Sequence, residues 1–425
     1  MKEYRSRVAD NVLQDNLAAA GAVLIEGPKW CGKTTTAEKA AASILYLDTP
    51  AELSRNLQIM EIDPAQLLRG ETPRLIDEWQ LAPTLWDTAR FEIDHRKATG
   101  QFIFTGSAVP ADKSKLLHSG TGRFAWLTMR PMSLWESGES SGAVSFEALF
   151  SGGSFTAEKA LPLSLEQLAF VLCRGGWPGT LEMAERSALR QSFNYLDAVV
   201  NQDIVRVDPS CRDTQFARRL IRSYARHQGS AVPIPVIHQD LKTNEGNTLS
   251  EDTIRSYLGA MRAIFVIEDM PAWNPNLRSK SAIRTSDTRY FVDASIATAA
   301  LGIGPKDLVN DLNTFGFLFE TMVVRDLRVY ANALDGDVFH FRDRNGLECD
   351  AVMHLRNGSY GLIEIKIGGE SAIEQAVRTL NQLESKIDTD RMPAPTFKMV
   401  LTGVGEYAYR RKDGILVAPI ASLRL

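Results

Sequence analysis

Gly27-Pro28-Lys29-Trp30-Cys31-Gly32-Lys33-Thr34 is the stretch that decides the fold, because it fits the pattern GxxxxGK[ST] without a mismatch. The apolar run Ala22–Ile25 before it predicts a strand, and the residues from about 33 to 42 predict a helix. A glycine-rich bend between a strand and a helix points backbone N–H groups at a phosphate, and the helix adds the positive end of its dipole. The stretch therefore predicts a phosphate-binding loop in an α/β fold.

The side chains of this loop indicate its ligands. Lys33 can reach the β- and γ-phosphates of a nucleoside triphosphate as a point charge, and the Thr34 hydroxyl can bind Mg²⁺. The sequence thus predicts ATP and Mg²⁺ as the cofactors of this site. The residues expected to contact the nucleotide are Gly27, Pro28, Lys29, Trp30, Cys31, Gly32, Lys33, Thr34, Thr35 and Ser107.

An acidic pair follows a later apolar run, in the sequence Leu75-Ile76-Asp77-Glu78. We expect Asp77 to bind Mg²⁺ through water, and Glu78 to orient and deprotonate the attacking water. Thr105-Gly106-Ser107 ends the next expected strand and can place a hydroxyl near the γ-phosphate. An acidic strand end facing solvent and an ordinary turn are the alternatives for these two segments.

Arg123 is the candidate for a cation that stabilises the transition state, because glycines on both sides free the backbone around it. Such an arginine contributes about three or more orders of magnitude in rate. A lone arginine is commonly a surface residue, so that alternative stays open. The sequence does not indicate whether Arg123 would act within one chain or across subunits.

The rest of the first 155 residues alternates between expected strands and helices. Further strands are expected at 44–47, 75–77 and 101–105, and helices at 1–20 and 83–97. This alternation predicts a parallel sheet covered on both faces. Residues 138–154 are rich in Gly, Ser and Glu and are expected to form a mobile surface segment.

Length and composition indicate a cytoplasmic protein of several domains. A chain of 425 residues is too long for one ordinary core. The four cysteines are scattered without metal-ligand spacing, which fits a reducing compartment. The longest apolar run near the N-terminus, Leu17–Ile25, is about half of the ~20 residues that span a bilayer, so no membrane association is expected.

Several stretches resemble a family of bacterial and archaeal AAA-type ATPases that carry a C-terminal domain of uncharacterised function. The stretches that resemble its ATPase domain are GPKWCGKTTTA (27–37), RLIDEWQ (74–80), FIFTGSA (102–108) and GRFAWLTMRPMSLWE (122–136). The stretches that resemble its second part are DTIRSYLGAMRAIFVIEDMPAWNPN (252–276) and RYFVDASIATAALG (289–302). The resemblance implies nucleotide binding at Gly27–Thr34, Asp77 and Glu78, a winged-helix segment, and a C-terminal region similar to PD-(D/E)XK nucleases. We therefore expect an ATPase domain at 1–155, a helical winged-helix region at 156–300 and a nuclease-like α/β domain at 301–425.

The middle of the chain is the part expected to contact DNA. A helix capped by Ser250, with Leu249 and Ile254 as a hydrophobic staple, would be the recognition helix, and 273–276 would lead into a wing. Residues 211–290 hold 12 Lys and Arg against 8 Asp and Glu, although the whole chain has a net charge of −4. The residues expected to contact phosphates are Arg255, Arg262, Arg278, Lys280 and Arg284. A module that binds only protein is the alternative.

The C-terminal part predicts three strands, at 338–342, 347–355 and 360–368, separated by turns that each contain Asn-Gly, and then a helix at 371–387. Alternation places Glu364 and Lys366 on one face of their strand. If Asp350 shares that face, the two carboxylates can hold Mg²⁺ while Lys366 stabilises the phosphate that is attacked.

The order of these residues is similar to the PD-(D/E)XK core, which implies functional roles for Glu320, Asp350, Glu364 and Lys366, assisted by Gln375. Cys349 stands where that pattern has proline. An inactive nuclease fold with a solvated salt-bridge network is the alternative. At the level of the whole protein, an ATPase that acts on or near DNA stands against a nucleotide-dependent switch that regulates a protein partner. The oligomeric state stays open.

Overall fold

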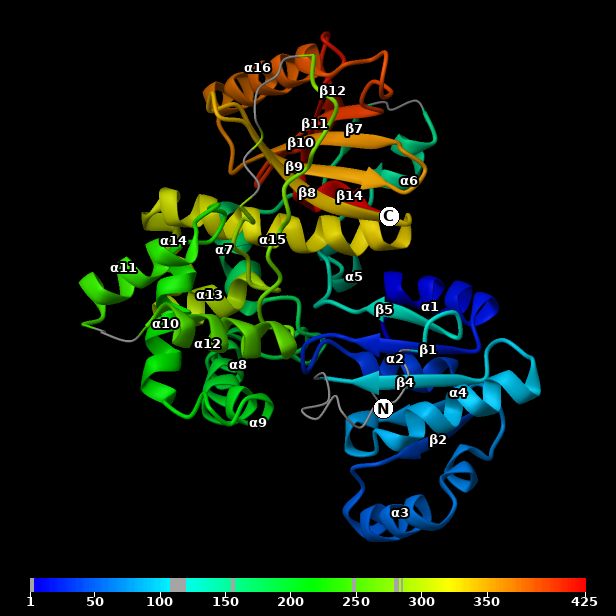
Figure 1. Ribbon diagram of the computed structural model, residues 1–425. Coiled ribbons are helices and arrows are strands. Elements are labelled where there is room, and N and C mark those ends of the chain that lie inside the picture. The colour runs from blue at the N-terminus through cyan, green and yellow to red at the C-terminus, as the bar shows by residue number, and fades with distance from the viewer. Residues whose placement is uncertain (1–3, 108–119, 154–156, 247–249, 279–282, 284–285) are drawn as a thin grey trace.

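The computed structural model of the protein describes residues 4–107, 120–153, 157–246, 250–278, 283 and 286–425. Figure 1 shows a small sheet in the N-terminal part, a bundle of helices in the middle, and a larger sheet in the C-terminal part, with the long helix α15 between the bundle and that sheet. No helix among the described residues is both long enough and apolar enough to span a bilayer.

The N-terminal sheet has five strands in the order β2-β3-β4-β1-β5, and all neighbouring strands are parallel. Its strands are β1 (Ala22–Glu26), β2 (Ser43–Tyr46), β3 (Arg74–Asp77), β4 (Phe102–Gly106) and β5 (Phe124–Thr128). Every residue of β4 is buried, as expected of a strand covered on both faces. The predicted parallel sheet is confirmed, and β5 is a strand that the sequence analysis missed.

Two hydrophobic clusters cover the two faces of this sheet. One cluster joins α4 to the sheet through Trp86 and Phe104, and the other joins α1 and α2 through Leu17 and Ala37. The helices are α1 (Val8–Ala19), α2 (Lys33–Ala40), α3 (Pro50–Ile62) and α4 (Thr84–Arg96), with the 3₁₀ turns η1 (Pro64–Leu68) and η2 (Trp79–Leu81). The sequence analysis missed α3, although Leu53, Leu57 and Met60 recur at helical spacing; these apolar residues stay partly or fully exposed in the structure.

Ser140, Val144, Ser145, Phe146 and Leu149 are buried, so the prediction of a mobile surface segment at 138–154 is wrong for this part, although 151–153 are exposed; Ser154 lies outside the described residues. The segment forms β6 (Val144–Ser145), which pairs with the C-terminal strand β14 (Leu423–Arg424), and then α6 (Phe146–Phe150). Phe146 is fully buried, with its ring 5.5 Å from that of Tyr330. The polar residues around Phe146 in the sequence gave no indication that its side chain packs against a distant part of the chain.

The middle of the chain is helical. Its elements are α5 (Leu134–Ser137), α7 (Leu165–Arg174), the 3₁₀ turn η4 (Pro178–Thr180), α8 (Glu185–Ala198), the π-helical turn η5 (Val199–Asp203), α9 (Ile204–Val207), α10 (Thr214–Arg226), α11 (Ile234–Asn244), α12 (Glu251–Ala263), α13 (Ala294–Leu301) and α14 (Pro305–Asn310). Ser250 caps α12 by accepting a hydrogen bond from the backbone N–H of Thr253, as expected. Leu249, the other half of the expected staple, lies outside the described residues.

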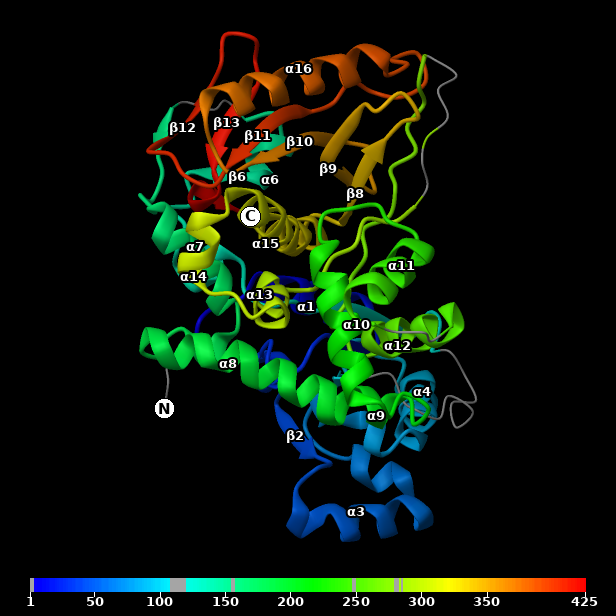
Figure 2. The same cartoon turned by 90° about the vertical axis from the view of Figure 1, so that its left-hand side faces the viewer.

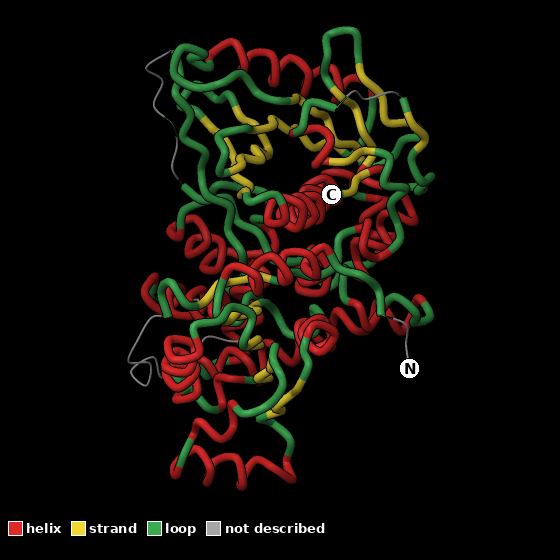
Figure 3. Tube along the Cα trace, turned by 90° about the vertical axis from the view of Figure 1, so that its right-hand side faces the viewer, coloured by secondary structure: helices red, strands yellow, loops and turns green. Residues whose placement is uncertain are grey.

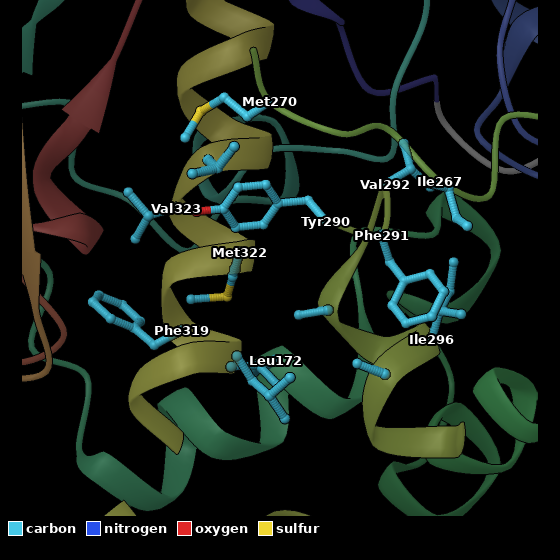
Figure 4. Packing of buried hydrophobic residues seen from close by; sticks show 14 of the residues in the cluster. Leu172, Ile267, Met270, Tyr290, Phe291, Val292, Ile296, Phe319, Met322 and Val323 are labelled. Carbon is cyan, nitrogen blue, oxygen red and sulfur yellow. The ribbon is translucent and has the colours of Figure 1, made fainter. Parts of the chain in front are cut away.

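Helix α15 (Leu312–Ala333) joins the middle helices to the C-terminal sheet. Figure 4 shows Phe319, Met322 and Val323 of α15 packed beside residues of the middle part, among them Tyr290. A single cluster of buried residues includes α7, α13, α15 and strands of the C-terminal sheet. The two parts therefore share one core, and the boundary expected after residue 300 stays a prediction.

The C-terminal sheet has seven strands in the order β7-β12-β13-β11-β10-β9-β8. They are β7 (Glu158–Lys159), β8 (Gly336–Arg342), β9 (Glu348–Leu355), β10 (Tyr360–Lys366), β11 (Phe397–Thr402), β12 (Tyr407–Arg410) and β13 (Leu416–Pro419), followed by the 3₁₀ turn η6 (Ile420–Ser422). The expected hairpins are confirmed, because β9 pairs antiparallel with both β8 and β10. Helix α16 (Glu370–Lys386) lies on one face and α15 on the other (Figure 2).

Candidate functional site

The phosphate-binding loop lies where β1 ends and α2 begins. Gly27 has a φ of 148°, and a Cβ there would lie 2.0 Å from the carbonyl oxygen of Met129. Gly32 has a φ of 102° directly before the first residue of α2. Any other residue at these positions would be strained, and at Gly27 it would also clash with backbone. The loop geometry therefore needs the glycines of the sequence pattern.

Lys33 is buried beneath the loop, with 6% of its surface exposed. Its ammonium donates hydrogen bonds to the carbonyl oxygens of Gly27 (2.9 Å) and Pro28 (2.8 Å). Both partners are neutral, so the positive charge is not compensated by an ion pair with a described residue. An ammonium held at the strand-to-helix bend is the arrangement that a triphosphate requires.

Asp77, the last residue of β3, meets the hydroxyl that begins the adjacent helix. Thr34 Oγ1 donates to Asp77 Oδ1 over 3.0 Å, and the Thr105 hydroxyl also donates to this carboxylate. Burial raises the pKa of Asp77 above its usual range, and both hydrogen bonds lower it. A carboxylate and a hydroxyl in contact are oxygen ligands of the type that Mg²⁺ prefers, so the two residues fit the ion.

Glu78 follows in a left-handed conformation with a φ of 56°. Its carboxylate accepts a hydrogen bond from the Gln80 amide. The pKa of Glu78 is raised, first by burial and then by the charge of Asp77, while the charge of Lys33 opposes this shift. Ser107, at the end of β4, is 5% exposed and lines the same cleft as Glu78.

Lys33, Thr34, Glu78 and Ser107 open onto one cleft of about 660 Å³, whereas Asp77, which is bonded to Thr34, is not part of its lining. The loop and the sheet contribute Lys29, Trp30, Gly32, Lys33, Thr34, Thr35, Glu78 and Ser107 to its lining. The middle helices contribute Pro178, Gly179, Thr180, Met183 and Gln191. The sequence analysis missed the second group, whose only local signal is the turn-forming run Gly175–Gly179.

Two residues of the loop have contacts that the sequence did not indicate. Lys29 forms an ion pair with Asp203 in η5, with 2.5 Å between Nζ and Oδ1. Cys31 is fully buried, and its thiol donates to the carbonyl oxygen of Met129 over 3.5 Å. Neither Cys31 nor Pro28 lines the cleft. Their expected contacts with the nucleotide stay a prediction, and such contacts would have to come from backbone atoms.

Arg123 lies far from this cleft. It directly precedes β5, whose first residue pairs with Ala22 at the beginning of β1, whereas the phosphate loop follows the end of β1. Its guanidinium forms an ion pair with Asp94 of α4 at 2.9 Å. Within one chain, Arg123 is therefore not placed to contact a phosphate at Lys33, because it lies at the opposite end of the sheet. An action across subunits stays a prediction.

A different arginine lies beside the site. A second cavity, of about 110 Å³, shares Lys29 and Ser107 with the cleft, and Gln80 and Arg206 also line it. Arg206 is exposed and forms no ion pair with any described residue. No sequence pattern links this residue of α9 to the phosphate loop, so the analysis could not have found it.

The C-terminal candidates also meet in space. Lys366 Nζ lies 2.8 Å from Asp350 Oδ2 and 2.9 Å from Glu364 Oε2. A cavity of about 360 Å³ beside them is lined also by Gln375 of α16. Burial, followed by the charge of Asp350, raises the pKa of Glu364. The structure thus brings together the three charged residues that the sequence predicted, with the ammonium of Lys366 between the carboxylates of Asp350 and Glu364.

Glu320 lies on α15, where its carboxylate accepts a hydrogen bond from the hydroxyl of Tyr290. Burial, followed by the charge of Asp350, raises its pKa. It does not line the cavity that holds Asp350 and Glu364. In the part of the chain that the structure describes, no three His, Cys, Asp or Glu side chains are grouped so that they could hold a metal ion.

The expected DNA-contacting residues are largely engaged with other protein groups. Arg262 pairs with Asp269 at 2.6 Å, Arg255 with Glu251 at 3.6 Å, and Arg278 donates to Thr389. Lys280 and Arg284 lie outside the described residues. Each of the three described residues therefore has a partner within the protein, and contact with DNA stays a prediction.

Trp273, which the sequence analysis expected to lead into a wing, is 3% exposed and packs in the core beneath α16, and the wing stays a prediction. Its indole N–H donates to His354 Nδ1 over 3.1 Å. Backbone bridges join Ala272 to His340 and Leu277 to Ile387. The segment therefore runs beside the C-terminal sheet, which lies in the upper half of Figure 3. Apolar contact with a distant sheet outweighs the local turn pattern.

Comparison with known families agrees with the geometry of the loop. Residues 19–137 match the AAA domain. The match supports nucleotide binding and hydrolysis by this AAA domain, although it covers only that part of the chain. Residues 165–307 and 315–423 match two domains of unknown function, DUF8612 and DUF4143.

No curated protein matches the chain. Among solved structures, a Walker-type ATPase of Pyrococcus abyssi is similar with a TM-score of 0.42 and 13% sequence identity. The similarity covers 70% of this chain and 96% of that one.

Proposed function

We propose that the AAA domain binds ATP with Mg²⁺ at Gly27–Thr34 and hydrolyses it. The observation that carries the proposal is one cleft lined by an ammonium, a hydroxyl and the Glu78 carboxylate, with the Asp77 carboxylate bonded to that hydroxyl, beside the carboxyl ends of β1 and β3. In this assignment Lys33 donates to the β- and γ-phosphates, and Thr34 and Asp77 hold Mg²⁺. The bound ion would neutralise charge on the phosphate oxygens.

Glu78 is the group that would accept a proton from the attacking water. Burial and the charge of Asp77 make its ionised form less stable, so this carboxylate takes up a proton more readily than an exposed glutamate. The water oxygen bonds to the γ-phosphorus while the bond to the bridging oxygen breaks, and ADP and phosphate are released. Release of phosphate from Mg-ATP by the purified full chain tests the proposal.

Arg206 would supply the cation that Arg123 does not supply within one chain. Its position beside Ser107, without an ion pair to a described residue, leaves its charge available to a γ-phosphate. We expect Arg206→Ala to lower the rate of ATP hydrolysis by about tenfold or more while ATP binding changes little, because such a cation acts mainly in the transition state. Phosphate release at saturating ATP measures this effect.

Arg212→Ala is the matched control. Arg212 is a nearby exposed arginine, and its Nε donates only to the carbonyl of Pro209. An unchanged rate in Arg206→Ala would leave the transition-state role to a residue outside this chain, such as Arg123 of another subunit.

A nucleotide-dependent switch is the second candidate function, and one set of contacts favours it. Arg7 donates to the carbonyl of Cys31 in the phosphate loop (2.7 Å) and pairs with Glu136 of α5 (2.9 Å). The backbone N–H of Leu134, also in α5, donates to Asp326 of α15 (2.9 Å). A change in the loop could thus reach α15, against which the C-terminal sheet packs. In this candidate, ATP selects one arrangement that a protein partner or DNA recognises.

Whether the C-terminal part cleaves DNA depends on the cluster Asp350, Glu364 and Lys366. The ammonium between the carboxylates lies where a divalent ion would compensate them, but it also fits the salt-bridge network of an inactive fold. If the site is active, we expect nicking of plasmid DNA in the presence of Mg²⁺ or Mn²⁺, and loss of nicking in Glu364→Ala and Lys366→Ala. Glu374→Ala, on α16, is the control. Nicking that survives both substitutions would assign the activity to another site or to a contaminant.

A further inference from the structure

The ion pair between Lys29 and Asp203 joins the phosphate-binding loop to the middle helices. Lys29 Nζ lies 2.5 Å from Asp203 Oδ1. The side chain of Asp203 is only 10% exposed, whereas that of Lys29 is 41% exposed. Among the described residues, Lys29 is the only ion-pair partner of Asp203. A nearly buried carboxylate therefore depends on one ammonium, and that ammonium belongs to the loop that is expected to hold the phosphates.

This ion pair lies at the end of the cleft where hydrolysis is proposed to occur. Lys29 lines the cleft together with Glu78 and Ser107. It also lines the smaller cavity of about 110 Å³, together with Ser107 and Asp203. Gln80, whose amide donates to Glu78, lines the smaller cavity as well. The ammonium of Lys29 therefore lies on the side of the cleft that would take the γ-phosphate.

Asp203 is held in place more firmly than Lys29. It ends the π-helical turn η5, and Val199 and Val200 of this turn are 1% exposed in the core of the middle helices. A single π-helical turn within a helix is rare and often lies at a functional site. Lys29 carries its ammonium on a flexible stem of four carbons, and much of this side chain is exposed. The ammonium can thus turn toward the cleft while the carboxylate stays at the wall.

ATP and ADP differ in what they offer to this ammonium. The γ-phosphate of ATP adds negative charge at the end of the cleft beside Lys29, and ADP has no group there. Because electrostatic attraction grows with charge, a γ-phosphate competes with Asp203 for the ammonium. Once Lys29 turns to the phosphate, the Asp203 carboxylate loses its partner. That loss weakens the binding of ATP but not the binding of ADP.

We propose that Asp203 is a specificity-determining residue of the nucleotide site: it holds Lys29 when no γ-phosphate is present and yields it to the γ-phosphate of ATP. The inference rests on the proposed nucleotide site and adds the regulation of that site. The carboxylate of Asp203 lowers the preference of the protein for ATP over ADP, and the ammonium of Lys29 raises it. After hydrolysis and release of phosphate, the ion pair forms again and joins the loop to η5.

Asp203→Asn and Lys29→Met should shift the preference for ATP in opposite directions. The amide of Asp203→Asn keeps the shape of the carboxylate but leaves no unpaired charge, so affinity for ATP should rise by about threefold or more. Lys29→Met leaves the Asp203 carboxylate without its partner beside the γ-phosphate, so affinity for ATP should fall by about tenfold or more. Affinity for ADP should change by less than about twofold in both variants, because ADP has no charge at this end of the cleft. Titration calorimetry of the full chain with a non-hydrolysable ATP analogue and with ADP, each with Mg²⁺, measures these affinities.

Asp197→Asn is the matched control, because Asp197 is exposed, pairs with Arg218 at 2.7 Å and lines neither cavity. It should leave both affinities unchanged. Lys29→Arg keeps the positive charge and should retain most of the wild-type preference. The binding of ADP by each variant shows that its fold is intact.

An unchanged preference in Asp203→Asn, or a shift in the same direction in Asp203→Asn and Lys29→Met, would overturn the role of Asp203 while leaving the nucleotide site in place. Wild-type protein that binds neither nucleotide would instead overturn the proposed function itself.

Discussion

Lys33→Ala is expected to remove most of the ATP-dependent protection against heat while leaving the fold intact. Loss of a buried, charge-assisted contact costs about 2–5 kcal/mol of binding free energy, which is at least ~30-fold in affinity. At an ATP concentration of about 100 Kd for the wild type, binding stabilises the protein by ~2.7 kcal/mol, whereas the same concentration is about 3 Kd or less for the variant and stabilises it by ~0.8 kcal/mol. The melting temperature with and without Mg-ATP measures the difference.

The fold should survive because the Lys33 ammonium bonds only to carbonyls of the loop, and water can replace it there. Lys412→Ala, at an exposed position in the turn between β12 and β13, controls for the loss of a positive charge. Equal protection of Lys33→Ala and wild type by ATP would contradict the assignment of the loop, and with it the proposed ATPase.

Glu78→Gln is expected to separate ATP binding from hydrolysis. The amide has nearly the same shape as the carboxylate but accepts no proton, so the rate should fall by about 10²–10⁴-fold, the usual contribution of a general base. Lys33, Thr34 and Asp77 are unchanged in this variant, so ATP should still raise its melting temperature. Phosphate release and thermal protection, measured on the same preparation, test both parts.

Glu61→Gln, on the exposed side of α3, is the control for the loss of one carboxylate. If hydrolysis and binding fall together in Glu78→Gln, Glu78 holds the nucleotide instead of activating water. If wild type and variant are equally inert while ATP binds both, the switch is favoured over the ATPase.

Local patterns were sufficient to predict the elements that carry the phosphate site. The glycines of Gly27–Thr34 predicted the bend, because no other residue can replace them there. An apolar run predicted β3 with Asp77 at its end. Two Asn-Gly turns predicted the hairpins on which Asp350 and Glu364 lie. In each case the physical constraint acts between residues a few positions apart, so the sequence contains it.

The opposite wall of the nucleotide cleft, by contrast, is decided only by tertiary structure. Pro178 and Met183 lie beside the phosphate loop because the middle helices pack there, and no period or spacing in the sequence encodes that contact. Apolar contact with a distant sheet likewise buries Trp273, and Arg123 lies at the end of the sheet away from the phosphate loop because β5 runs parallel to β1.

The sequence by itself therefore determined that a loop able to grip phosphate follows β1, because backbone conformation there depends on glycine. Tertiary structure decided what faces that loop, because burial of apolar surface is non-directional and can join segments at any distance along the chain.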